Sequence, residues 1–221
     1  MIRFSLFGIP ISIHWMFWVL SAFLGGALDA RGQEEWILVF TFMLAATFSI
    51  LVHEFGHALA GLRLGAPRVQ IMLHSLGGLA RFEGAHFGRK GRILMTAAGP
   101  AASIGLAVLF YFIGQFVLVG GGEGRTYFQL VLQYFVGVVV MINIFWSIIN
   151  LMPIMPLDGG QILLAALGPS RLKLSCIISF VTIGFLAVAL WLSTRSFFNI
   201  LVMLFLASHT WQVFKAADES R

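Results

Sequence analysis

The pentapeptide His53-Glu54-Phe55-Gly56-His57 carries two imidazoles four residues apart, with a carboxylate between them. On an α-helix, residues four apart lie on one face, one turn from each other, so both rings can reach a single metal ion. Glu54 lies beside them and can take a proton from a metal-bound water. The pattern indicates a divalent-metal site with a carboxylate base, although it also occurs by chance in soluble helices.

A zinc site that performs hydrolysis takes three protein ligands and keeps one position for water. The best candidate for the third ligand is Asp158, in the segment Asn150-Leu151-Met152-Pro153-Ile154-Met155-Pro156-Leu157-Asp158-Gly159. Its two prolines break a helix locally, and such a break can aim the carboxylate inward. Asp158 could instead serve only as the N-cap of the helical stretch that follows. We favour the ligand.

The composition defines the solvent in which these residues must be positioned. The chain has 221 residues, of which 59% are hydrophobic and 10% are charged, whereas soluble domains carry about 25% charged residues. So few charges exclude a soluble globule, and they exclude disorder, since disordered chains are charge-rich. The sequence therefore predicts a membrane protein that crosses the bilayer several times.

Long stretches without Asp, Glu, Lys or Arg mark the elements that must carry the site. A spanning helix needs about 20 residues, and we predict an all-α fold of about six transmembrane helices in one domain, residues 1–221. The spans are predicted near 9–28, 36–62, 93–119, 127–166 (broken at the proline segment), 174–193 and 196–214. The glycine-rich and basic segment 67–92 predicts a short membrane-associated β-hairpin between the second and third spans.

The basic residues predict the orientation. The net charge of +5 comes from residues between apolar runs, so it reports membrane topology rather than nucleic-acid binding. If both termini are in the cytoplasm, the only basic residues on the outer side of the membrane are Arg31, Arg125 and Arg195. We therefore expect a multi-pass protein of a prokaryotic plasma (inner) membrane. Glu54 and Asp158 are the only charged residues that we place at membrane depth, which makes both functional candidates.

These residues resemble a known family. HEFGH in the second span and NLMPIMPLDGG in the fourth are similar to the two motifs of the site-2 protease family of intramembrane zinc metalloproteases. The resemblance extends to Ala98-Gly99-Pro100 and to the glycine-rich region 74–82. From these 221 residues we expect a member that consists of the six-span core, without the PDZ or CBS domain that some relatives carry.

The resemblance implies a site and a reaction. His53, His57 and Asp158 would bind one zinc ion per chain, Glu54 would be the catalytic acid/base, and Asn150 would hold the substrate or the oxyanion. The expected activity is cleavage of a transmembrane segment of a membrane-protein substrate near the cytoplasmic side. The expected partners are that substrate, the lipid bilayer and, as an option, a regulatory membrane protein, with no nucleic acid.

Four further residues have two readings each. Asn143, seven residues before Asn150, faces the substrate or only bonds a neighbouring helix. Gly77 and Gly78 belong to an edge strand for the substrate or to a plain loop. His14 opens the first span as a gate or supporting residue, or as a packing histidine; packing is the simpler reading.

Two other functions compete with this interpretation. Prenyl-processing membrane proteases also carry H-E-x-x-H but take a glutamate from a later helix as the third ligand. No later span here holds a Glu. A divalent-metal transporter could use the same two histidines and Asp158 for transit, but it would be expected to show an internal repeat or a second polar pathway.

Overall fold

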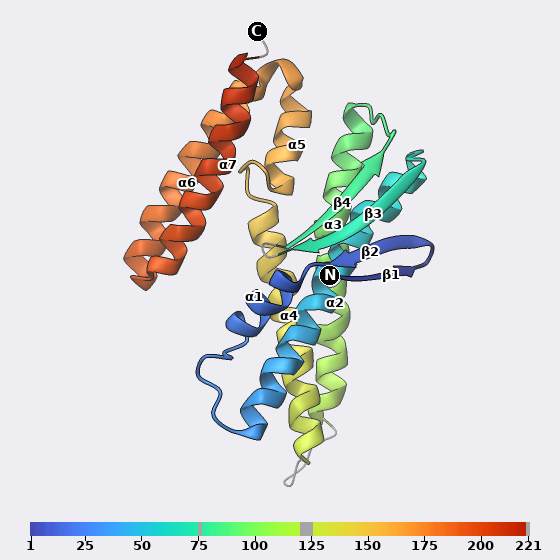
Figure 1. The fold of residues 1–221 in the computed structure, drawn as a ribbon, viewed down its shortest axis with the longest axis vertical. Coiled ribbons are helices and arrows are strands. Elements are labelled where there is room, and N and C mark those ends of the chain that lie inside the picture. The colour runs from blue at the N-terminus through green and yellow to red at the C-terminus, as the bar shows by residue number, and fades with distance from the viewer. Residues whose placement is uncertain (75–76, 120–125, 220–221) are drawn as a thin grey trace. The chain divides into compact units, whose positions relative to one another are not determined.

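The computed structural model describes residues 1–74, 77–119 and 126–219, which are mostly helical (Figure 1). In chain order the elements are β1 (Ile2–Leu6), β2 (Ile9–Ile13), α1 (Trp15–Leu24), α2 (Gln33–Arg63), β3 (Arg68–His74), β4 (Gly77–Glu83), α3 (Arg89–Val119), α4 (Tyr127–Asn150), α5 (Asp158–Leu167), the short 3₁₀ helix η1 (Pro169–Arg171), α6 (Leu172–Thr194) and α7 (Phe197–Glu219).

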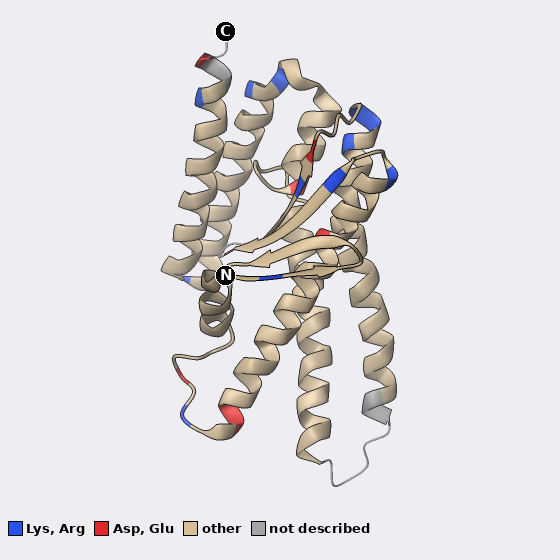
Figure 2. Cartoon of the chain, turned by 45° about the vertical axis from the view of Figure 1, so that its right-hand side comes forward, with Lys and Arg blue, Asp and Glu red and all other residues tan. Residues whose placement is uncertain are grey.

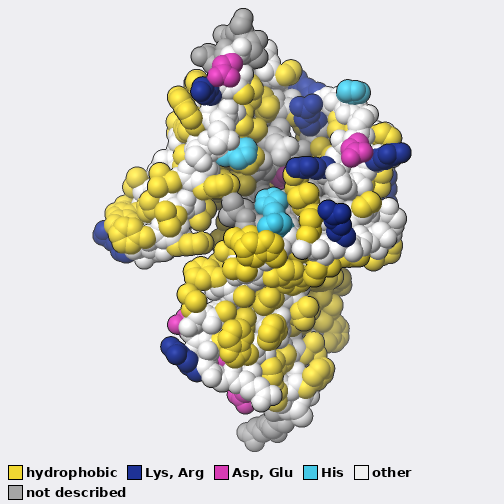
Figure 3. Space-filling view, viewed as in Figure 1, with side chains coloured by type: hydrophobic (Ala, Val, Ile, Leu, Met, Phe, Trp, Pro, Cys, Tyr) yellow, Lys and Arg dark blue, Asp and Glu magenta, His cyan; other side chains and the backbone are white. Residues whose placement is uncertain are grey.

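Within the described residues, five helices are long and apolar enough to cross a membrane. They lie at Gln33–Arg63, Arg89–Phe116, Tyr127–Asn150, Pro169–Thr194 and Phe197–Ala216, with mean hydropathies between 1.5 and 2.3. Large apolar side chains remain exposed on these helices, among them Phe145 and Phe185 (62% and 72% exposed). Figure 3 shows such side chains spread over the helix surfaces, and Figure 2 shows charged residues gathered mainly near helix ends and on the sheet. Both patterns are those of helices solvated by lipid.

The first predicted span, residues 9–28, is wrong. Ile9–Ile13 form strand β2, and the helix that follows, α1, has only ten residues, about 15 Å at 1.5 Å per residue. Ile9, Ile11 and Ile13 alternate with Pro10 and Ser12, which is the period of a strand rather than of a helix. Length without charge could not reveal this, because it does not distinguish a strand followed by a short helix from one long helix.

The sheet has four strands, and only its second half was predicted. Strands β3 and β4 form the expected antiparallel hairpin, with Arg68 opposite Glu83 and His74 opposite Gly77; Ser75 and Leu76 lie outside the described residues. The N-terminal hairpin β1–β2 turns at Phe7 and Gly8, both with positive φ, and β2 pairs in parallel with β3. The strand order is β1-β2-β3-β4, so β1 and β4 are the outer strands.

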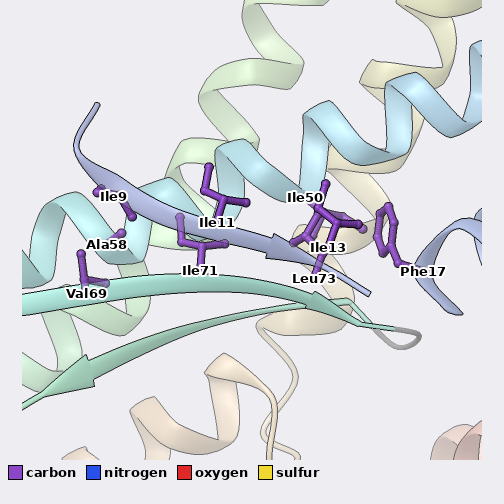
Figure 4. Close-up of a cluster of buried hydrophobic side chains, with 9 residues drawn as sticks. All are labelled: Ile9, Ile11, Ile13, Phe17, Ile50, Ala58, Val69, Ile71 and Leu73. Atoms are coloured by element: carbon purple, nitrogen blue, oxygen red, sulfur yellow. The ribbon is translucent and has the colours of Figure 1, made fainter. Parts of the chain in front are cut away.

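The core of the sheet lies against the second half of α2. Alternate residues of β2 and β3 point the same way and meet Ile50 and Ala58 of α2 (Figure 4). The strand residues of this cluster are Ile9, Ile11, Ile13, Val69, Ile71 and Leu73. The sheet is thereby fixed next to the segment of α2 that carries the histidines.

The contacts group the chain into two compact units. The first unit comprises Met1–His86 and Ala98–Ser147, and the second comprises Phe87–Ala97 and Ile148–Arg221. The fourth predicted span is broken as expected, because α4 ends at Asn150 and α5 begins at Asp158. Arg125, which entered the orientation prediction, lies outside the described residues.

Candidate metal centre

Three buried side chains of α2 form a group that can hold a metal ion. His53, Glu54 and His57 are at most 7% exposed, and one donor atom from each lies within 4.8 Å of the others. The Nε2 atoms of the two histidines are 3.2 Å apart. Two nitrogens on one tetrahedral zinc, each about 2.05 Å from it, would be about 3.3 Å apart. The spacing and the donor types therefore fit zinc.

The ring of His53 is oriented by a residue of another helix. Its Nδ1 lies 3.1 Å from Oγ of Ser103, a fully buried residue of α3. If Nε2 binds a metal, Nδ1 carries the proton and donates it to the hydroxyl oxygen. Ser103 thereby fixes both the tautomer and the direction in which the metal-binding nitrogen points.

Glycines let neighbouring backbones approach the three side chains. A Cβ atom at Gly99 of α3 would collide with the ring of His57, and one at Gly78 of β4 would collide with the carboxyl group of Glu54. Gly56, between the two histidines, packs against the carbonyl of Ala98. The Ala98-Gly99-Pro100 and Gly77-Gly78 segments thus pack directly against the metal-binding motif.

Asn143 of α4 is fully buried in the same unit. Its side-chain N–H₂ donates to Ser49 Oγ of α2 and to the carbonyl of Val139, each at 2.8 Å. Ser49 lies one turn before His53. Asn143 therefore makes the interhelical bond that was one of its two predicted readings, and it makes it one turn from the metal motif.

His14 caps a helix. The ring Nδ1 of His14 accepts a hydrogen bond from the backbone N–H of Met16 at 3.3 Å. The backbone N–H of His14 donates to the carbonyl of Leu73 at 2.8 Å. It therefore ties α1 to β3. On β3, partial burial lowers the pKa of His74, and the electrostatic interactions with His14 and Arg81 lower it further.

Asn150 and Asp158 belong to the second unit and lie at the two ends of one loop. Both are buried, Asn150 as the last residue of α4 and Asp158 as the first of α5. The N-cap of α5 is Leu157, so Asp158 is not the cap that the alternative reading required. Its carboxylate lies in the first turn, where the helix dipole favours a negative charge.

Most backbone N–H groups of the loop between them have a hydrogen-bond acceptor. Pro153 and Pro156 have no N–H to offer, and the Met155–Pro156 peptide is cis. Four other N–H groups of the loop donate: Met152 to Ile149, Ile154 to Met152, Leu157 to Ile154, and Met155 to the hydroxyl of Ser179. Gly159 and Gly160 pack so closely on the backbone of residues 151–155 that a Cβ atom at either would overlap it.

Three hydroxyl residues near these motifs escaped the sequence prediction: Ser103 beside His53, and Ser179 and Thr210 beside the loop. Each lies in an apolar span, where serine and threonine are common and usually bond the preceding turn of their own helix. Their partners come from distant parts of the chain. A hydroxyl inside an apolar stretch was the only available signal, and it is unspecific.

Several known proteins are similar to this chain. The sequence model of Peptidase family M50 matches residues 119–190. A zinc metalloprotease of Methanocaldococcus jannaschii is 26% identical over 164 residues, which cover 74% of this chain and 44% of that protein. A Synechocystis protein, whose name also assigns it to the zinc metalloproteases, is 31% identical over 171 residues, 72% of this chain and 42% of that one.

The fold matches a solved structure over nearly its whole length. The site-2 protease from Methanocaldococcus jannaschii aligns with a TM-score of 0.62 and 26% identity, covering 96% of this chain and 94% of that one. These comparisons confirm the resemblance to the site-2 protease family that the two motifs indicated, in an integral membrane protein. The chain spans less than half the length of the two curated relatives.

Proposed function

We propose that this chain is a zinc-dependent intramembrane endopeptidase that cleaves a transmembrane segment of a membrane-protein substrate near the cytoplasmic side. We place both termini in the cytoplasm, in a prokaryotic plasma membrane. The observation that carries the proposal is the buried group of His53, Glu54 and His57 on an apolar helix. Ionisable groups are costly in hydrocarbon and are kept there for function, and metal binding accounts for all three together.

The proposed ligands are two imidazoles and one carboxylate. His53 and His57 would bind zinc through Nε2, and we assign Asp158 as the third ligand from its residue type and its place in the second motif. A zinc ion held there would lower the pKa of a bound water and polarise the peptide carbonyl. Ser103 keeps the Nε2 atom of His53 available for this role.

The remaining chemistry belongs to the side chains. Glu54 accepts a proton as the water oxygen bonds to the carbonyl carbon, and it returns that proton to the nitrogen when the C–N bond breaks. The side-chain amide of Asn150 donates to the carbonyl oxygen as negative charge develops on it. The products are a carboxylic acid and an amine, which exchange the second water proton to become a carboxylate and an ammonium group.

A helical substrate must unwind before its peptide bond can be attacked, and its freed backbone groups then need partners. Strand β4 is an outer strand of the sheet, and Gly78 within it lies against the carboxyl group of Glu54. An extended substrate segment that adds to β4 would be held beside this base. This supports our assignment of Gly77 and Gly78 to substrate binding.

The test is the substitution Glu54→Gln in the full chain in its native membrane. We expect zinc content to remain, because the ligands are intact, and cleavage to fall by about 10²–10⁴-fold, because the general base is lost. Membrane-protein fragments would be compared by proteomics between cells with wild-type and variant protein. Glu83→Gln, which removes an exposed carboxylate on β4, is the matched control and should leave the fragments unchanged.

A different outcome would favour a different function. Equal fragments from wild type and Glu54→Gln would contradict the protease. If His57→Ala then abolished zinc flux into proteoliposomes, the same residues would serve a divalent-metal transporter. Neither a transporter nor a structural zinc site requires a carboxylate between the two histidines that is dispensable for metal binding.

A further inference from the structure

Two hydroxyl groups in the second unit bond the loop that carries Asn150 and Asp158. Ser179 Oγ of α6 accepts the N–H of Met155 at 3.0 Å and lies 3.2 Å from the carbonyl of Pro153. Thr210 Oγ1 of α7 donates to the carbonyl of Met155 at 2.8 Å. Both hydroxyl residues are fully buried. Met155 is thus held through its N–H by one helix and through its C=O by the other.

An apolar contact reinforces the same attachment. Ile154 is fully buried and packs with Ile183 of α6 and Leu206 of α7. Ile183 lies four residues after Ser179, and Leu206 lies four residues before Thr210, so each helix presents an apolar residue and a hydroxyl on one face. Helices α6 and α7 therefore both contact Ile154 and Met155, through apolar side chains and through hydroxyl groups.

The hydroxyls satisfy groups that nothing within the loop satisfies. The N–H groups of Met152, Ile154 and Leu157 find acceptors in the loop or in α4. The N–H group of Met155 donates instead to the hydroxyl of Ser179 in α6. At membrane depth an unsatisfied backbone group is costly, because no bulk water is available to replace the partner. Removing a hydroxyl therefore favours rearrangement of the loop backbone at its midpoint.

We propose that Ser179 and Thr210 are positioning residues: by holding both polar groups of Met155, they fix the path of residues 151–157 and so the directions of Asn150 and Asp158 at its ends. The inference rests on the proposed function, in which Asn150 binds the carbonyl oxygen and Asp158 binds zinc. Both hydroxyls act through the loop backbone.

The test uses the full chain in detergent, with three variants at the two positions and two control variants. Thr210→Val keeps the shape and removes the hydroxyl, Thr210→Ser restores it, and Ser179→Ala removes the second hydroxyl. We expect the Kd for zinc, measured by competition with a chelator of known affinity, to rise about tenfold or more in Thr210→Val and Ser179→Ala. Thr210→Ser should bind zinc as the wild type does.

Two residues of α6 provide matched controls. Thr182 bonds only the carbonyl of Ile178 in its own helix. Ser175 is fully buried one turn before Ser179, and its hydroxyl has no hydrogen bond among the described residues. Thr182→Ala and Ser175→Ala should keep the wild-type Kd for zinc, even where they lower the melting temperature as much as Ser179→Ala does.

Two further measurements separate positioning from simple stability. Amide hydrogen exchange of a peptide covering residues 150–158 should become faster in Ser179→Ala and Thr210→Val and stay unchanged in the controls. With a labelled peptide spanning the strongest cleavage site found in the Glu54→Gln comparison, kcat should fall about tenfold while KM changes little. A loss of stability alone would lower the active fraction without raising the Kd of the folded protein for zinc.

The outcomes are distinct. If Glu54→Gln abolishes cleavage but the hydroxyl variants keep wild-type zinc Kd and kcat, the positioning role is refuted and the protease stands. If Thr210→Ser behaves as Thr210→Val does, the methyl packing rather than the hydroxyl matters, and the inference also fails. If wild type and Glu54→Gln cleave equally, the proposed function fails first, and the inference falls with it.

Discussion

The two motifs of this chain are held in different ways. His53, Glu54 and His57 lie on one uninterrupted helix of 31 residues, so their relative placement follows from the geometry of α2. Asn150 and Asp158 lie at the ends of a loop of seven residues whose midpoint is bonded by Ser179 and Thr210 from two later helices. The first motif is locally determined, whereas the second depends on tertiary contacts.

This difference determines what disturbs each motif. In the first motif, glycines pack against side chains, and Gly99 lies against the ring of His57. In the second unit, Gly159 packs against the carbonyl of Leu151, which is backbone and cannot rotate away. An added methyl group should therefore displace a ligand in the first case and strain the fold in the second.

The largest effect is expected at Gly99. Gly99→Ala places a Cβ against the ring of His57; the ring can turn aside, but its Nε2 then leaves the metal position. We expect the Kd for zinc to rise by at least about 100-fold with little change in melting temperature. Gly105→Ala on the same helix, where a Cβ would meet nothing within 4 Å, should change neither. Unaltered zinc binding in Gly99→Ala would show that the first motif tolerates displacement.

A smaller and different effect is expected at Gly159. Gly159→Ala forces the loop backbone away from α5, and we expect the free energy of unfolding to fall by about 1–3 kcal/mol, as for other overpacked sites. Thermal unfolding in detergent measures it. The control is Gly184→Ala in α6, where the added methyl meets open space and the gain in helix propensity should be neutral or stabilising. Equal stabilisation by both would contradict the tight packing of the loop.

The smallest effect is expected at Ser103. Ser103→Ala removes the acceptor of the His53 Nδ1–H, and a lost partner of this kind weakens metal binding by about 10–100-fold. Zinc competition against a chelator measures it. Thr41→Ala is the control, since Thr41 bonds only the carbonyl of Ile37 in its own helix. A Kd equal to that of the wild type would mean that α2 alone orients His53, which would sharpen the contrast between the two motifs.

The sequence predicted the helical membrane class, the later spans and the break before Asp158, because each has a local signature: length without charge, or paired prolines. It failed at residues 9–13, where apolar residues alternate with Pro10 and Ser12 within a longer apolar run. The length of the charge-free run suggested one long helix, although residues 9–13 alternate with the period of a strand. It also missed that β2 joins β3, because a parallel pairing between strands about 60 residues apart leaves no local mark.

By itself, the sequence singled out the residues that we propose carry the chemistry. Two histidines and a glutamate at helical spacing, and an aspartate after two prolines, are recognisable because charged and metal-binding groups are rare in apolar spans. Only the tertiary structure decided what holds them: Ser103 on His53, Gly78 against Glu54, and Ser179 and Thr210 on the loop. The reason is physical. Helical periodicity is fixed by neighbouring residues, whereas the partner of a buried hydroxyl or glycine is fixed by whichever distant segment packs against it.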